Sequence, residues 1–122
     1  MVAGAPDFRF CNGYRLHEAD EFSAVFASRR VLRGNRFDLH YSTGSDSGAR
    51  LGLIIAKKLA RRAVHRNLLK RLAREVFRQA RPTLPKYDLV LRLARAPGES
   101  LGAESRFAWR SDVEQLLARL PR

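Results

Sequence analysis

The sequence AKKLARRAVHRNLLKRLAREVFRQAR occupies residues 56–81 and has helical periodicity along its whole length. Ten lysines and arginines and a single acid, Glu75, lie between positions 57 and 81, which gives the segment a formal charge of +9. A helix of this sequence has an apolar arc about 160° wide, which requires a packing partner. The arc is predicted to face the core and contains Val64, Leu68, Leu69, Leu72, Val76 and Ala80.

The opposite side of this predicted helix is a basic face about 140° wide. This face contains Arg66, Asn67, Lys70, Arg71, Arg74 and Arg78. Like charges four residues apart destabilise an isolated helix, and solvated helix faces usually mix acids with bases. A polyanion therefore explains the basic face better than solvation does, and the excess of arginine over lysine favours bidentate phosphate contacts. Asn67 is uncharged, so an RNA contact and an ordinary surface position both stay open for it.

The length and net charge of the chain limit the number of domains and the kind of partner that can be expected. The chain has 122 residues, a formal net charge of +12 and a pI near 11.3. This length suits one domain, predicted over residues 14–122 after an irregular segment at 1–13. The charge indicates nucleic acid or an anionic membrane as partner. Because no apolar run approaches the length of a membrane-spanning helix, we expect no membrane partner.

The sequence shows neither a targeting signal nor the groups of a protein ribonuclease. Its N-terminal residues do not form a secretory signal, so we expect a cytoplasmic location. The single cysteine, Cys11, excludes an intrachain disulfide and leaves no zinc-site pattern. His17, His40 and His65 lie on different predicted elements, and the twelve acids are scattered. No catalytic residue and no protein metal site are therefore assigned.

The first half of the chain is predicted to contain one short helix and two strands. The helix spans residues 18–27, and the simplest interpretation places Phe22, Val25 and Phe26 in the core. The alternating strand 37–41 points Phe37, Leu39 and Tyr41 one way and Asp38 and His40 the other. Residues 42–48 are predicted as the loop of a hairpin that ends in the apolar strand 51–56, covered on both faces.

The second half is predicted to contain a strand over residues 87–93 and a helix from about 105 to the C-terminus. The core face of this helix is expected to include Phe107, Ala108, Val113, Leu116, Leu117 and Leu120, with Trp109 near its start and Asp112 on a mixed surface. The fold class is therefore α/β, of a sandwich-like α+β kind. A small mixed sheet of three to four strands packs with about three helices and contains a β-α-β crossover, which general rules expect to be right-handed.

An ordered set of residues in the basic segment carries a family resemblance. The order is Ala56-Lys57-Lys58, Arg61-Arg62-Ala63, Arg66-Asn67, Lys70-Arg71, Arg74-Glu75 and Phe77-Arg78. It resembles the signature helix of the bacterial ribonuclease P protein component, and weaker similarity extends over roughly residues 14–120. Where the family usually has Arg-Asn-Arg, this chain has Arg66-Asn67-Leu68. Because Leu68 falls in the apolar arc, no third basic contact is assigned.

The resemblance implies a left-handed crossover and a protein that assists a catalytic RNA. It implies binding of the ribonuclease P RNA by Lys57, Lys58, Arg61, Arg62, Arg66, Asn67, Lys70, Arg71 and Arg74. It also implies a cleft for the single-stranded 5′ leader of precursor tRNA, formed by Phe22, Phe26, Phe37 and His40. The RNA subunit would hold the Mg²⁺ ions and the cleaving centre, and the holoenzyme would remove the leader by phosphodiester hydrolysis.

Two other classes of protein compete with this interpretation. A non-enzymatic RNA-binding protein, such as a ribosomal component, would share the charge and the small α/β scaffold. The ordered Arg-Asn and Lys-Arg signature and the aromatic first helix argue against it. A transcription factor with a major-groove helix is less favoured, because the wide apolar arc buries one side of the helix and no second helix precedes it by a short turn. No DNA partner is expected.

Overall fold

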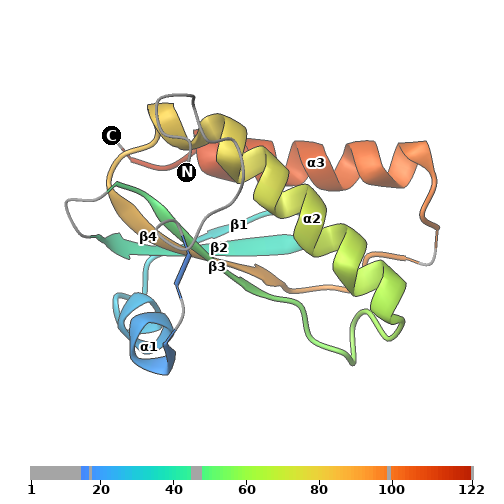
Figure 1. Ribbon diagram of the computed structural model, residues 1–122, viewed down its shortest axis with the longest axis horizontal. Helices are drawn as coiled ribbons and strands as arrows, with labels where there is room; N and C mark the ends of the chain where they lie inside the picture. Colours follow the sequence, from blue (N-terminus) through green and yellow to red (C-terminus); the bar gives the residue numbers. More distant parts are fainter. Residues whose placement is uncertain (1–14, 17, 45–47, 99, 122) are drawn as a thin grey trace, which may run out of the picture.

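The computed structural model describes residues 15, 16, 18–44, 48–98 and 100–121, so the predicted irregular segment 1–13 lies outside it. Within these residues, three α-helices, a short 3₁₀ helix and four strands follow one another (Figure 1). In order they are α1 (Ala19–Ala27), β1 (Val31–Arg33), β2 (Phe37–Thr43), β3 (Arg50–Ile54), α2 (Ala63–Ala80), η2 (Arg81–Thr83), β4 (Tyr87–Leu93) and α3 (Ala103–Ala118). The predicted α+β class is confirmed.

The four strands form one mixed sheet in the order β1-β2-β4-β3. β1 and β2 form an antiparallel hairpin, β2 pairs antiparallel with β4, and β3 pairs parallel with β4. The predicted hairpin between residues 37–41 and 51–56 is therefore wrong, because β4 lies between β2 and β3. β3 is also not an interior strand, since its other side carries only an isolated bridge from Arg15 to Leu51 among the described residues.

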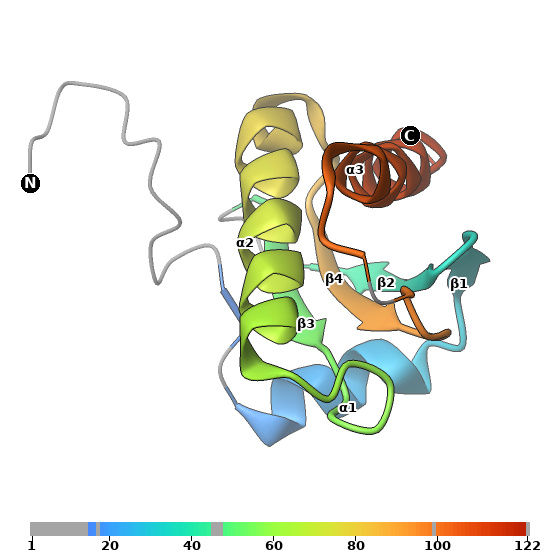
Figure 2. The same cartoon turned by 90° about the vertical axis from the view of Figure 1, so that its right-hand side faces the viewer.

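The β3-α2-β4 unit is a crossover between adjacent parallel strands. Viewed from the α2 side with both strands pointing up, β4 lies to the left of β3, so the crossover is left-handed (Figures 1 and 2). Crossovers of this kind are right-handed in about 98% of cases. The handedness implied by the family resemblance is thus the one observed, and the general rule is wrong for this chain.

The sheet separates two unequal layers. α2 and α3 lie on one face, and α1 lies on the other face near the start of β3 and β4 (Figure 2). The main core fills the space between the sheet and the two long helices, where Phe37, Leu39, Leu89, Leu91 and Leu116 are almost fully buried. A much smaller cluster under α1 contains Leu16, Val25 and Val90, with Phe22 and Ile54 packed against it.

The basic helix begins later than the sequence pattern indicates. α2 starts at Ala63. Residues 55–62, most of which were predicted to be helical, form a loop with turns between β3 and α2. The amides of Leu59 and Ala60 both donate to the Ala56 carbonyl at 3.1 Å, which closes a local turn. Lys57, Lys58, Arg61 and Arg62 therefore lie on a loop, and only the later cations of the segment lie on the helix.

The predicted core face of α2 is correct in its middle and wrong at its start. Leu69, Leu72 and Val76 are buried as expected, whereas Val64 is 53% exposed. Val64 lies in the first turn of α2, which extends past the ends of the strands (Figure 1). Additional buried positions are His65, Ala73 and Phe77.

α3 covers the core with its second half, as predicted for Val113, Leu116 and Leu117, and the predicted core residue Leu120 is buried just after the helix. Phe107 is 72% exposed and Ala108 is exposed, so these two predicted core residues are wrong. Asp112 does not belong to a mixed surface. Its buried carboxylate accepts the backbone N–H groups of Asn35, Arg36 and Phe37 at 2.9, 2.9 and 3.0 Å, and so fastens the β1–β2 turn to α3.

Candidate nucleic-acid interface

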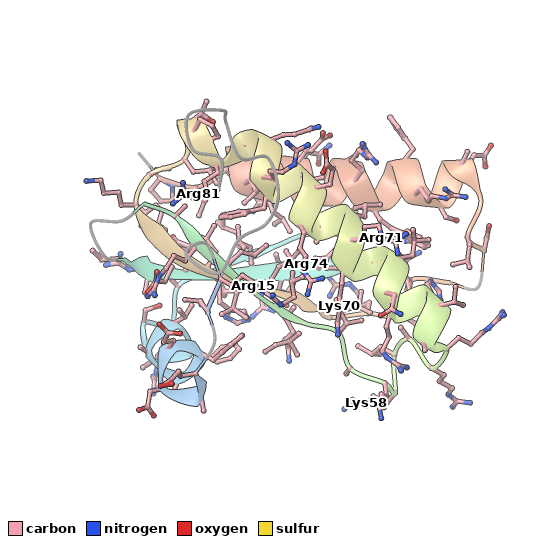
Figure 3. All side chains as sticks on the ribbon, in the orientation of Figure 1. Arg15, Lys58, Lys70, Arg71, Arg74 and Arg81 are labelled. Atoms are coloured by element: carbon pink, nitrogen blue, oxygen red, sulfur yellow. The ribbon has the colours of Figure 1, made fainter. Side chains whose placement is uncertain are left out.

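The predicted RNA-binding residues occupy two consecutive parts of the chain. Lys57, Lys58, Arg61 and Arg62 are exposed on the loop that precedes α2, and Arg66, Asn67, Lys70, Arg71 and Arg74 follow on α2. Lys58, Lys70, Arg71 and Arg74 all extend from this one side of the molecule (Figure 3). We call these nine residues the cationic band. The structure thus brings the predicted set together, although RNA contact itself stays a prediction.

Arg66 connects the helical part of the band to the loop. Its Nη1 donates to the Ala60 carbonyl at 3.0 Å and to the Arg61 carbonyl at 2.8 Å. These bonds fix the backbone that presents Arg61 and Arg62. Arg66 therefore has a structural role that the sequence pattern did not indicate, in addition to any phosphate that its remaining N–H groups contact.

Several ion pairs of the described residues lie outside the cationic band. They join Arg33 and Arg95 to Asp38, Arg50 to Glu21 and Asp88, and Arg78 to Glu75. Glu75 forms its bonds with Arg78 and Gln79, at the C-terminal end of α2. The local acid therefore offsets Arg78, which is outside the predicted site, and leaves the positive potential concentrated from residue 57 to residue 74.

Arg15 belongs to the same surface and was missed by the sequence analysis. Its backbone bridges to Leu51 at the β3 edge, and its side chain lies near Arg74 between β3 and α2 (Figure 3). Burial, followed by the Arg15 charge, lowers the pKa of Arg74 from its ordinary value. Arg15 therefore adds a positive charge next to the helical part of the cationic band. The two arginines are separated by 59 positions in the chain, so the proximity of Arg15 to Arg74 follows only from the pairing of residue 15 with β3.

The second predicted site lies on the opposite face of the sheet, where α1 packs. The rings of Phe26 on α1 and His40 on β2 meet edge to face, with centroids 4.7 Å apart. Phe26 is 37% exposed and His40 is half-buried. We call Phe22, Phe26 and His40 the aromatic patch. An exposed ring beside a partly buried imidazole is suited to stacking on an unpaired base.

Phe22 lies deeper in this patch than Phe26. It packs against the small cluster of Leu16, Val25 and Val90. Gly52 on β3 makes this position possible, because a Cβ there would come within 2.5 Å of two Phe22 ring atoms. Phe22 is therefore mainly a support for α1, and Phe26 offers the more accessible ring.

Phe37 does not belong to the leader site. Its side chain is 0% exposed and lies in the main core on the α2 and α3 side of the sheet. The strand alternation already directed Phe37 and His40 to opposite faces. Including Phe37 in the cleft was wrong, because one strand cannot present both residues to the same surface.

The environment of His40 is strongly basic. Burial, followed by the Arg92 charge, lowers the pKa of His40, whereas Asp38 acts in the opposite direction. Arg92 is exposed on β4 and pairs in register with Asp38, so it lies on the same sheet face as His40. Arg92 is thus a second cation near a predicted RNA site that the sequence analysis missed, because its position followed only from the β2–β4 pairing.

Within the described ranges no group of three or more His, Cys, Asp or Glu side chains is placed to hold a metal ion. In the same part of the chain, no helix combines the length and apolar character needed to cross a bilayer.

Comparison with known proteins identifies the family. The family described as Ribonuclease P matches residues 10–120. The chain belongs to the ribonuclease P protein family. It is 53% identical over 119 residues to the ribonuclease P protein component of Azoarcus sp. strain BH72, covering 98% of this chain and 95% of that protein. A second relative of the same name, from Ralstonia pickettii strain 12J, is 46% identical over 94 residues, which are 76% of this chain and 67% of the relative.

Solved structures of the family have the same fold. The ribonuclease P protein of Thermotoga maritima superimposes with a TM-score of 0.75 at 27% identity, covering 88% of this chain and 98% of that one. The Staphylococcus aureus protein gives a TM-score of 0.74 at 23% identity over 86% and 93% of the two chains, and it supports the fold alone. Family membership makes this chain a protein subunit of an endoribonuclease.

Proposed function

We propose that this chain binds the ribonuclease P RNA through the cationic band and the 5′ leader of precursor tRNA through the aromatic patch. The observation that carries the proposal is the spatial separation of these two surfaces. The band runs along α2 and the loop before it, and the patch lies across the sheet under α1. One small domain can then contact two RNA molecules at once.

The band supplies charge and shape, and no bond-breaking chemistry. Its cations would release counterions from RNA phosphates and reduce the repulsion between the catalytic RNA and its substrate. Its loop part is held in one conformation by Arg66, which lowers the entropic cost of binding. Lys57, Lys58, Arg61 and Arg62 would contact phosphates, and Asn67 has the donor and acceptor needed for a base edge or a ribose hydroxyl.

The patch would receive bases of the single-stranded leader. The accessible face of Phe26 would stack on one base, and Arg92 beside His40 would contact the adjoining phosphate. Because a stacking contact tolerates any base, leaders of different sequence could occupy the same site.

We further propose that Mg²⁺ is held mainly by the RNA subunit and that the chain acts in the cytoplasm. The donor chemistry of the two surfaces is cationic or aromatic, whereas Mg²⁺ requires oxygen ligands. The chain's residues would orient the two RNAs, and the hydrolytic chemistry would be supplied by the RNA and the ions bound to it.

Cleavage of precursor tRNA at low Mg²⁺ tests this function. A bacterial ribonuclease P RNA should cleave faster with the chain than without it, and the chain alone should cleave nothing. Tight RNA binding with no stimulation would instead favour a non-enzymatic RNA-binding protein. A precursor with a one-nucleotide leader provides a matched control, since it should lose the part of the stimulation that depends on the aromatic patch.

A further inference from the structure

A hollow of about 420 Å³ lies at the N-terminal end of α2, between the loop before the helix and the segment after β4. Its lining residues are Lys58, Leu59, Ala60, Arg61, Arg62, His65, Ala96 and Gly98. The volume falls within the range of about 300–1,000 Å³ that is usual for small-molecule sites. We call it the His65 hollow. The RNA contacts proposed above involve the loop cations at the rim of the hollow, and none of them involves its interior.

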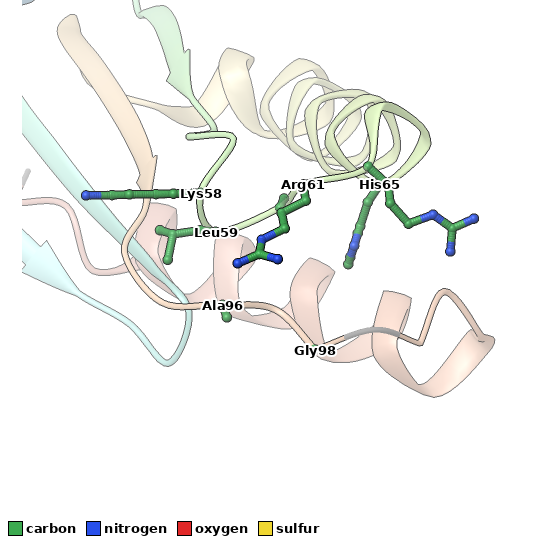
Figure 4. A pocket seen from close by; sticks show the side chains of 8 residues that line it. Lys58, Leu59, Arg61, His65, Ala96 and Gly98 are labelled. Atoms are coloured by element: carbon green, nitrogen blue, oxygen red, sulfur yellow. The ribbon is translucent and has the colours of Figure 1, made fainter.

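His65 lines the hollow and carries an unsatisfied polar atom, Nε2. The residue is only 6% exposed, and no described group lies within hydrogen-bonding distance of its buried Nε2. Its ring packs against Trp109 of α3, with centroids 5.4 Å apart. Figure 4 shows His65 and Arg61 both pointing from the loop and α2 toward the segment that contains Ala96 and Gly98. A buried polar atom of this kind usually has a partner.

The electrostatics of the hollow favour an anion at its rim. Three of its lining residues are basic and none is acidic. α2 begins without a side-chain cap and without an acid in its first turn, so the positive end of its dipole is not offset. Burial, followed by the Arg62 charge, lowers the pKa of His65, so the imidazole is neutral at neutral pH and can donate or accept one hydrogen bond.

The hollow is also preformed. Arg66 holds the carbonyls of Ala60 and Arg61, and Gly98 adopts a φ of +87°, which suits glycine and keeps the facing wall without a side chain. The interior side chains of Leu59 and Ala60 are apolar and partly or fully buried. An apolar floor, one buried polar atom and a cationic rim match a nucleotide, whose base is flat and mostly apolar and whose phosphate is anionic.

We propose that the His65 hollow binds a single unpaired nucleotide of the partner RNA. The base enters beside His65 and bonds to Nε2, Arg61 stacks on it or contacts its phosphate, and Lys58 and Arg62 contact the adjoining backbone. RNA is favoured over a free nucleotide because the rim continues directly into the cationic band, which would hold the flanking phosphates. This inference rests on the proposed function and adds one defined subsite to it.

The only tryptophan of the chain, Trp109, reports directly on this site because it contacts His65. The experiment titrates the full chain with uridine and adenosine 5′-monophosphates, and with inorganic phosphate at equal ionic strength. Tryptophan emission and the His65 imidazole NMR resonances are followed. A nucleotide should change both signals, whereas phosphate should leave the His65 resonances unchanged. Equal responses to phosphate, or no response to any of the three, would overturn the proposal.

Variants at position 65 test the hydrogen bond. His65→Leu keeps an apolar side chain against Trp109 and should bind nucleotide and ribonuclease P RNA about five- to tenfold more weakly. His65→Gln retains a donor and an acceptor and should restore part of the affinity, which a loss of folding would not allow. Gln115→Leu, an exposed polar-to-apolar change on α3, is the matched control and should bind like the parent chain.

Competition distinguishes the two sources of the nucleotide. Saturation with ribonuclease P RNA should prevent the response to added mononucleotide, and unchanged mononucleotide binding in the complex would contradict the assignment to RNA. The low-Mg²⁺ cleavage assay separates the two proposals. A His65→Leu chain with unchanged RNA affinity and full stimulation of cleavage would overturn the hollow alone, and failure of the parent chain to stimulate would overturn the proposed function.

Discussion

The two faces of the sheet differ in how completely they are buried. On the α2 and α3 side, Phe37, Leu39, Leu89 and Leu91 form a closed apolar layer with almost no exposed surface. On the α1 side, a nine-residue helix covers only part of the sheet, and the same strands present polar side chains. The comparison indicates that one face stabilises the fold, whereas the other leaves aromatic and polar groups accessible, as the proposed leader site requires.

β2 shows the contrast within one strand. Alternate residues leave it in opposite directions, so Phe37 and Leu39 enter the main core while Asp38 and His40 face α1. Asp38 is 2% exposed, and its carboxylate lies 3.3 Å from Arg33 and 3.6 Å from Arg95. The following predictions test whether stability and leader binding divide between the faces in this way.

Truncation of Phe37 should give the largest effect. Phe37→Ala removes a fully buried ring from the closed face and should lower the free energy of unfolding by about 3–5 kcal/mol. Urea denaturation followed by circular dichroism measures the change. A stable Phe37→Ala chain with a specific loss of leader binding would reverse the assignment of the two faces and restore Phe37 to the leader site.

Substitution of Asp112 should have the next largest effect. Asp112→Asn replaces an ionised acceptor of three backbone N–H groups, and it should lower the free energy of unfolding by about 2 kcal/mol. The same denaturation experiment applies. Glu114→Gln is exposed on the same helix and should change stability by no more than about 0.5 kcal/mol. Equal effects of the two changes would mean that the β1–β2 turn does not depend on Asp112.

Truncation of Phe26 should leave the fold intact and affect the face of the sheet on which α1 packs. Phe26→Ala should weaken binding of a precursor with a long leader about tenfold, because one stacking partner is lost. Binding of mature tRNA by the same holoenzyme should not change. Equilibrium binding with labelled RNAs measures both affinities, and an equal loss for the two RNAs would show that Phe26 acts on the holoenzyme and not on the leader.

A change of pH should give the smallest effect, and its sign follows from the two histidines. Burial lowers the pKa of both His40 and His65 in the folded chain. As the pH falls through about 6.5, the two histidines are protonated in the unfolded chain before they are protonated in the folded chain. Acid therefore reduces the free energy of unfolding. Denaturation at about pH 7.5 and about pH 5.5 should show the decrease. His40→Phe should show a smaller decrease, and an unchanged or larger one would contradict the burial of His40.

Sequence reasoning located most elements because they have strong local signals. The strand at 87–93 was predicted with its observed bounds, and the acids of the first turn placed the start of α1 within one residue. Leu69, Leu72 and Val76 were correctly assigned to the core because helical spacing in a long helix leaves one arc for packing.

The errors concern features that depend on distant residues. The false hairpin arose because adjacent strands usually pair, whereas β4 takes the place between β2 and β3. The helix start was placed too early because cations in a loop and cations on a helix have the same composition. Arg15, Arg92 and Asp112 were missed for a related reason, since each takes its role from a residue more than 50 positions away.

The central position of β4 has a consequence for synthesis on the ribosome. β4 is the last strand to leave the exit tunnel, yet both β2 and β3 need it as a neighbour. Until residues 87–93 emerge, the nascent chain carries one hairpin with an open edge, a separate strand and a strongly basic segment. The sheet therefore closes late and in a single step, so the cationic segment is exposed to cellular RNA before it has a scaffold.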